Sequence, residues 1–147
     1  MIEGIVNTGA LPVLEMAVGY ASARQRLLAH NIANLSTPDF VQRDVSPESF
    51  QQFLRTAVQE RRERRGSAGG MQGELRPPSS REIQIGPTGV RLSPKSPRPG
   101  VLFHDRNNRD IERLMQDMAE NSAAYRVAID LMRSQSEIMK MAIAQRV

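Results

Sequence analysis

The side chains that carry most enzymatic and metal chemistry are scarce in this sequence. Its 147 residues include two histidines and no cysteine, which excludes disulfides, thiolate metal sites and cysteine nucleophiles. His30 is expected on a helix surface and His104, beside Asp105, in a loop, and neither has a second histidine or a carboxylate at metal-ligand spacing on one face. We therefore predict that the protein is not an enzyme and that it has no metal and no cofactor.

The composition is that of a single domain with an aliphatic interior. Hydrophobic residues make up 39% of the chain, aromatic residues only 4%, and tryptophan is absent. Within the first 30 residues, Arg24, Arg26 and His30 interrupt the only apolar run. We expect no cleaved secretory signal and no membrane insertion, so any passage out of the cytoplasm requires another route.

Positive charge is concentrated in the middle of the chain. The net charge is +4, and residues 61–100 hold eight Arg and one Lys against three Glu. A solvated loop explains this excess, and arginines near a helix C-terminus complement the helix dipole. The alternative is a small basic module that grips nucleic acid through residues 61–65. No aromatic platform accompanies these arginines, so we predict no nucleic-acid partner.

The elements that position these side chains are mostly helical. Residues 1–9 read as a mobile lead-in, and Pro12 suits the first turn of a helix over residues 11–33. Apolar residues then recur at alternating spacings of 3 and 4, which is the pattern of a heptad seam. The seam consists of Leu11, Leu14, Val18, Ala21, Gln25, Leu28, Ile32 and Leu35.

A shorter amphipathic helix and an irregular segment follow. Ser46-Pro47-Glu48 is a helix start, an apolar stripe runs from Phe50 to Val58, and Gly66 is the expected stop. Seven Gly and six Pro occur in residues 66–100, which indicates that this middle forms little of a core. Ile83 and Ile85, then Val90 and Leu92, alternate on either side of a four-residue loop at 86–89 and predict a short β-hairpin.

The last third of the chain predicts a second long helix, over about residues 109–145. Asn107 or Asn108 is the expected cap, with Asp110 and Glu112 in the first turn. Five methionines lie on this helix, and methionine adapts its shape to a partner. The predicted seam is Ile111, Met115, Met118, Ser122, Tyr125, Ile129, Met132, Ser136, Met139 and Ile143.

These elements predict a mainly α protein. Residues 10–35 and 107–147 would form a coiled-coil-like helical core, 36–65 a turn and a short helix, and 66–106 a basic linker with the hairpin. Exposed seams favour burial against neighbours as well as within the chain. We predict that four residues of the first seam meet four of the second, within one subunit or between neighbours: Leu14, Val18, Leu28 and Ile32 against Tyr125, Ile129, Met132 and Met139.

Two motifs support a family resemblance. The first resembles the N-terminal signature of flagellar rod and hook proteins: Asn31, Ala33, Asn34, Thr37, Pro38 and Phe40. The second, residues 103–113, resembles a segment of a proximal-rod member of that family and includes Asp105, Asn107, Asn108 and Asp110. Met118 to Asn121 and Tyr125 agree with the last helix of that member. The first signature is shared across the family, so another rod component is the nearest alternative.

The resemblance implies a structural subunit of the flagellar drive shaft, located in the basal body in the periplasmic space after export. Its implied partners are copies of itself, other rod proteins, membrane-ring and rod-adaptor components at the base, and the flagellar type III export apparatus. Two positions depart from the family pattern, which usually has Gly where this chain has Asp39 and Arg106. Glycine suits a positive φ there; Asp tolerates that region better than Arg.

Overall fold

The protein is described by a computed structural model that covers residues 10–68, 75–76, 78, 80–86, 89–96 and 110–144, with backbone alone at 65–68. The described residues form three helices and a two-stranded antiparallel sheet. These elements are α2 (Leu11–Ala33), α3 (Pro47–Ala68), β1 (Ile83–Gly86), β2 (Gly89–Leu92) and α4 (Ile111–Ala144). The prediction of a mainly α fold with a terminal helix pair, a shorter helix and a hairpin is confirmed.

Local sequence explains where the helices begin and end. Pro12 lies in the first turn of α2, where a missing N–H leaves no helical carbonyl unpaired. The Ser46 hydroxyl accepts a hydrogen bond from the Ser49 N–H at 3.1 Å, as an N-cap of α3 does. Helix α3 continues through Gly66 to Ala68, two residues beyond the predicted stop. A glycine lowers helix propensity but does not by itself end a helix.

Helix α4 begins later than its predicted caps. The Asp110 carboxylate accepts a hydrogen bond from the Arg113 N–H at 3.1 Å, and the Asp110 carbonyl accepts one from Leu114 at 3.2 Å. Asp110 is therefore the N-cap of α4. The candidate caps Asn107 and Asn108 lie outside the described residues.

The hairpin has a tighter connection than the sequence indicated. Its register pairs Ile83 with Leu92 and Gly86 with Gly89. The strands therefore reach one residue further at each side than the predicted four-residue loop allows. Gly89 has φ +112, a backbone conformation that side chains disfavour, which explains a glycine at this position.

The main hydrophobic core lies between α2, α3 and the hairpin. It contains six buried residues, of which Ile83 comes from β1: Met16, Tyr20, Val45, Phe50, Phe53 and Ile83. The Tyr20 and Phe50 rings stack with centroids 3.9 Å apart. Of these six residues Ile83 alone comes from residues 66–100, so the middle of the chain adds one buried residue to this core. Side chains alternate between the two faces of a strand, and this alternation places Ile83 in the core, where it is 2% exposed.

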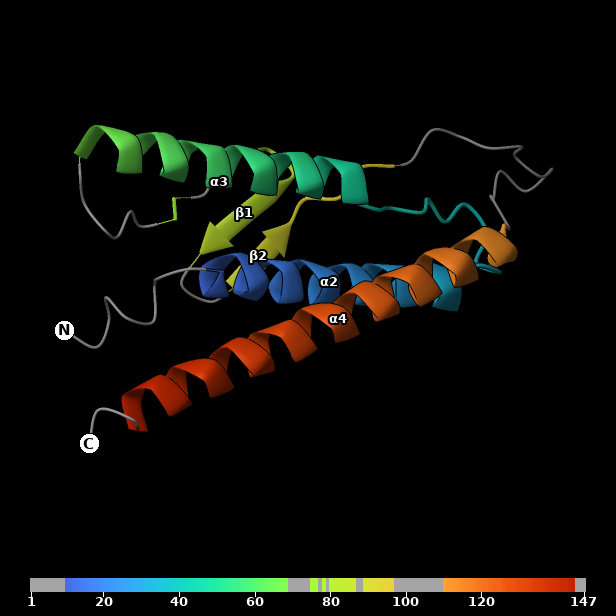
Figure 1. Ribbon diagram of the computed structural model, residues 1–147. Helices are drawn as coiled ribbons and strands as arrows, with labels where there is room; N and C mark the ends of the chain where they lie inside the picture. Colours follow the sequence, from blue (N-terminus) through green and yellow to red (C-terminus); the bar gives the residue numbers. More distant parts are fainter. Residues whose placement is uncertain are drawn as a thin grey trace.

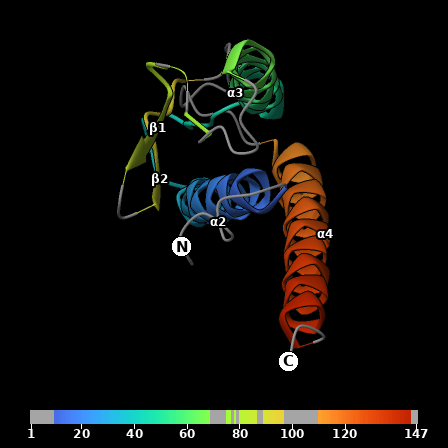
Figure 2. The same ribbon diagram turned by 60° about the vertical axis from the view of Figure 1, so that its left-hand side comes forward.

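Helix α2 is the central element. Figure 1 shows the hairpin between α2 and α3, and α4 running antiparallel to α2 along its other side. After rotation, α2 lies between the hairpin and α4, with α3 above them (Figure 2). Close packing holds the hairpin on α2, because a Cβ at Gly19 would lie 2.8 Å from the Val90 Cγ2. One helix thus connects the main core to the C-terminal helix.

Candidate assembly surface

Polar side chains meet in the middle of the interface between α2 and α4. The Asn121 amide donates to the Ala21 carbonyl at 2.9 Å and to the Gln25 side-chain oxygen at 2.7 Å. Gln25 also donates to the Ser122 hydroxyl at 3.2 Å. Asn121 is only 4% exposed, so its partners are needed to offset desolvation. A shift of either helix along the other would leave these groups unpaired, and the layer therefore fixes the register.

A buried cation joins α2 to two other segments. The Arg24 guanidinium donates to the Asp44 carboxylate from Nη2 at 2.7 Å and from Nε at 3.1 Å, and it lies 3.5 Å from the Asp117 carboxylate. Arg24 is 3% exposed. Burial alone would lower its pKa, but the hydrogen bond to Asp44 and the charge of Asp44 outweigh burial and raise the pKa. Arg24 stays charged and links α2, the α2–α3 connection and α4.

The antiparallel register decides which predicted packing residues lie together. Because Gln25 pairs with Ser122, residues further along α2 lie beside earlier turns of α4. Leu28, fully buried, and Ile32 therefore lie at the Leu114 end. Met139 lies about 26 Å further along α4 than Ser122. Within one chain Leu28 and Ile32 lie beside the first turns of α4, so a contact of these two residues with Ile129, Met132 or Met139 stays a prediction for neighbouring subunits.

The other packing residues lie on the half-buried side of the helix pair. Leu14 and Val18 on α2 are half-buried, as are five on α4: Met118, Tyr125, Ile129, Met132 and Met139. The buried residues of α4 are Leu114, Asn121 and Ala128, spaced by seven. Ile111 and Met115, at 45% and 52% exposure, do not pack in the pair within one chain. The seam within the chain therefore runs through Leu114, which was not among the predicted seam residues.

Asn31, in the N-terminal signature, ties the end of α2 to the following segment. Its side-chain amide donates to the Arg43 carbonyl at 2.8 Å, and its side-chain oxygen accepts from the Arg43 N–H at 3.2 Å. Asn31 is 3% exposed. This two-bond contact mimics one step of a β-ladder, and it holds the chain beside α2 just before Asp44 reaches Arg24.

The remaining signature residues build the turn after α2. The Asn34 amide donates to the His30 carbonyl at 2.9 Å, and Thr37 N–H donates to the Asn34 carbonyl at 3.0 Å. Exposed His30 lies against half-buried Phe40, with ring centroids 5.5 Å apart. Two further signature residues, Ala33 and Pro38, are exposed. These residues together reverse the chain without a buried site for chemistry.

Asp39 stands where the family pattern usually has glycine, and its backbone adopts a conformation that glycine favours. Its φ is +58, and it is the one non-glycine residue with positive φ in the described part of the chain. Aspartate adopts this region at lower cost than most residues. The structure therefore explains both the usual glycine and the tolerance for Asp. His104, Asp105 and Arg106 lie outside the described residues, so their turn stays a prediction.

A second apolar stripe on α4 faces away from α2. Its members follow one another at spacings of 4, 7 and 3 residues and are each more than half exposed: Val127 59%, Leu131 53%, Ile138 53% and Met141 58%. We call these four residues the outer stripe. Figure 1 shows the C-terminal end of α4 reaching past the start of α2. Ile143, 59% exposed, lies on this end. An apolar face of this kind is typical of an interaction surface.

Sequence reasoning missed the charged centre of the helix pair. Arg24 was noted only as an interruption of an apolar run, and Asp44 and Asp117 were not considered. A signal was present, since Arg24 lies three residues after Ala21 and four before Leu28, both buried. A charged residue at a seam position indicates a buried partner. The polar seam members Gln25 and Ser122 were identified, but not that they bind each other.

The described residues offer little to catalysis. No group of three His, Asp or Glu in the described ranges is arranged to hold a metal ion. None of the described helices has an apolar stretch long enough to span a membrane. Burial raises the pKa of the Tyr20 hydroxyl, which donates to the Val45 carbonyl at 2.7 Å, so Tyr20 remains a neutral core residue. Helix contacts and exposed apolar surface are the main features of the described ranges, and they are typical of a subunit that packs against other chains.

Comparison with known proteins agrees with this class. No family model matches the chain. Over 148 residues the chain is 31% identical to the flagellar basal body rod protein FlgB of Proteus mirabilis (strain HI4320), and the match covers 99% of each protein. The chain therefore belongs to the FlgB family of flagellar basal body rod proteins. The resemblance seen in the two terminal motifs is confirmed, and the relative also spans the middle segment, where the sequence offered little to align.

Proposed function

We propose that this protein is a subunit of the proximal rod of the flagellar basal body, that it assembles laterally through its terminal helices, and that it passes torque from one subunit to the next. Its proposed partners are copies of itself and other rod proteins, with ring and adaptor components at the base. It would reach the periplasmic space through the flagellar export apparatus. In this role it binds no substrate and catalyses no reaction.

The observation that carries the proposal is the outer stripe. Helix α2 is covered by α4, the hairpin and α3, whereas the four apolar side chains of the outer stripe on α4 face water. Burial of the exposed half of Leu131 or Ile138 contributes about 1 kcal/mol each. Repeated along a helix and between many subunits, such contacts stabilise an array. In a member of a rod family, the neighbour that covers this stripe is another rod subunit.

The test replaces stripe residues without disturbing the fold. Leu131→Asp with Ile138→Asp places charges on an exposed face, so the purified chain should keep its helical circular dichroism. Cells with this variant should lack hooks and fail to swim, because each charge would be buried without a partner between subunits. Val41→Asp is the matched control, since Val41 is 56% exposed but lies outside α4. Normal hooks in the double variant would reject assembly through the outer stripe.

A further inference from the structure

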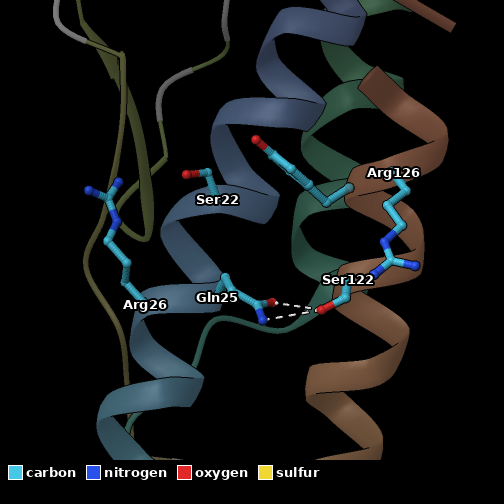
Figure 3. Close-up of a pocket in the computed structure, with 6 residues that line it drawn as sticks. Ser22, Gln25, Arg26, Ser122 and Arg126 are labelled. Atoms are coloured by element: carbon cyan, nitrogen blue, oxygen red, sulfur yellow. Dashed lines mark hydrogen bonds between the residues drawn. The ribbon is translucent and has the colours of Figure 1, made fainter. Parts of the chain in front are cut away.

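A polar pocket opens between α2 and α4, on a side of α4 away from the outer stripe. Its volume is about 440 Å³, and it is lined by Ser22, Gln25, Arg26, Ser122, Tyr125 and Arg126. We call it the α2–α4 pocket. Figure 3 shows three of these residues projecting from α2 and Ser122 and Arg126 from α4, with Gln25 joined to Ser122. The pocket therefore straddles the two helices whose register the polar layer fixes.

The pocket holds hydrogen-bond donors without acceptors. Arg26 and Arg126 are exposed, and neither forms an ion pair or hydrogen bond within the described part of the chain. The Ser22 and Tyr125 hydroxyls likewise have no hydrogen-bond partner among the residues that the structure describes. Arg24, on another face of α2, binds two carboxylates. Arg126 lies beside Ser122 on the α4 side of the pocket, whereas Arg26 extends toward its opposite edge (Figure 3). A guanidinium group beside unpaired hydroxyls in a concave site is complementary to a carboxylate.

The same chain carries an unpaired carboxylate at a matching position. Glu112 is exposed, and among the described residues it has no ion pair. Residues 112, 119, 126, 133 and 140 follow one heptad line along α4, and they are Glu, Ala, Arg, Arg and Lys. The line thus changes from acidic to basic. A second α4 displaced by two heptads, about 21 Å, would bring its Glu112 level with Arg126 of the first.

We propose that the α2–α4 pocket binds Glu112 of a second copy of this chain. This inference rests on the proposed function and specifies one contact of the assembly. The two surfaces are different patches of the same molecule, so the contact is heterologous and does not close on itself. Every subunit offers one pocket and one Glu112, so each can bind a neighbour on either side. The outer stripe supplies affinity, and the ion pair sets the axial stagger between copies.

A charge swap tests this contact in a strain that lacks the gene. Glu112→Arg and Arg126→Glu, each alone, should reduce the number of hook-bearing basal bodies about tenfold, because like charges would meet in every copy of the contact. Both substitutions in one chain restore the pair and should bring the number back to within about twofold of wild type. Arg55→Glu is the control, because Arg55 is exposed on α3 and does not line the pocket. Circular dichroism of each purified chain checks that it folds.

The contact is overturned if either single variant assembles like the wild type, or if the combined variant stays as defective as the single ones. Failure of the proposed function looks different, because a strain without the gene would then still build rods. Thiol crosslinking gives a readout that does not need rods, since the chain has no cysteine of its own. Glu112→Cys with Arg126→Cys should give a ladder of oligomers when the concentrated purified chain is treated with a short bis-maleimide, which spans the gap that the Glu and Arg side chains fill. Each single cysteine should give no species larger than a dimer, and absence of the ladder would refute the contact.

Discussion

Removal of the Asp44 carboxylate should destabilise the protein more than any other single change in the polar network. Asp44 accepts three hydrogen bonds from Arg24, at 2.7, 3.1 and 3.3 Å. In Asp44→Ala the guanidinium remains buried, with only the 3.5 Å contact to Asp117. Loss of one partner of a buried ion pair costs about 3–5 kcal/mol. Because the Asp44 side chain is 22% exposed, some water reaches the site. We expect a loss of about 2–3 kcal/mol.

Urea unfolding followed by circular dichroism measures this loss. For an m-value of about 2 kcal/mol per molar urea, the midpoint should fall by roughly 1–1.5 M. The backbone of Asp44 pairs with Lys95, and alanine leaves those bonds in place. Asp117→Ala is the internal comparison: its carboxylate is more exposed and further from Arg24, so it should cost at most about 1 kcal/mol.

A double variant separates the free energy lost by leaving the buried Arg24 charge unpaired from the free energy that the Arg24–Asp44 pair contributes. Arg24→Met with Asp44→Ala removes the buried cation along with its partner and keeps most of the side-chain volume. It should be more stable than Asp44→Ala alone, because no unpaired charge remains. A midpoint for Asp44→Ala within about 0.3 M of wild type would refute the reasoning. So would a double variant whose loss equals the sum of the two single losses.

Three further substitutions test the supporting contacts by thermal unfolding. Gly19→Ala gains helix propensity but places a methyl group against Val90, so the free energy of unfolding should fall by about 1 kcal/mol. Adding Val90→Ala should reverse this loss. An unchanged or higher Tm in the single variant would contradict the close packing. Asn31→Ala should cost about 2 kcal/mol through its two bonds to Arg43, and a change below about 0.5 kcal/mol would show that those bonds contribute little. Asp39→Val should lose about 1–2 kcal/mol at its positive φ, whereas Asp39→Gly should not, and equal effects would exclude backbone strain.

Periodicity and capping predicted the elements because both are local. The bounds of α2, the start of α3 and the hairpin follow from signals within a few residues, such as Ser46 before Pro47. The packing of those elements was harder to predict. Asp44 is 20 residues from Arg24, and Asp117 is 93 residues away. No local pattern indicates which carboxylate will bind a buried arginine, so the ion pairs of Arg24 could not be predicted from the sequence.

The pairing of α4 with α2 was predicted from the sequence, but the register between the two helices was not. Ile111, Met115 and Met118 continue one heptad series, and the series alone does not show which edge of the stripe is buried. Asn121 specifies which edge of the stripe is buried, because its side-chain amide forms its hydrogen bonds when it faces α2. That choice turns Leu114 inward and leaves Ile111 exposed. A polar residue specified the register that the apolar residues left open.

Helix α4 has one side that packs on α2 and another side, with the outer stripe, that is exposed. The main core joins α2, α3 and the hairpin, and no residue of α4 belongs to it. Helix α4 is held to α2 by a layer with Arg24, Gln25 and Asn121, which favours one register over its neighbours more than it adds affinity. Its largest apolar side chains are therefore left free for other chains. A leucine-rich seam in place of the polar layer would bind α2 more tightly. It would also allow the two helices to slip along each other. Slippage would shift Glu112 relative to the α2–α4 pocket, and the stagger proposed between subunits would then be irregular.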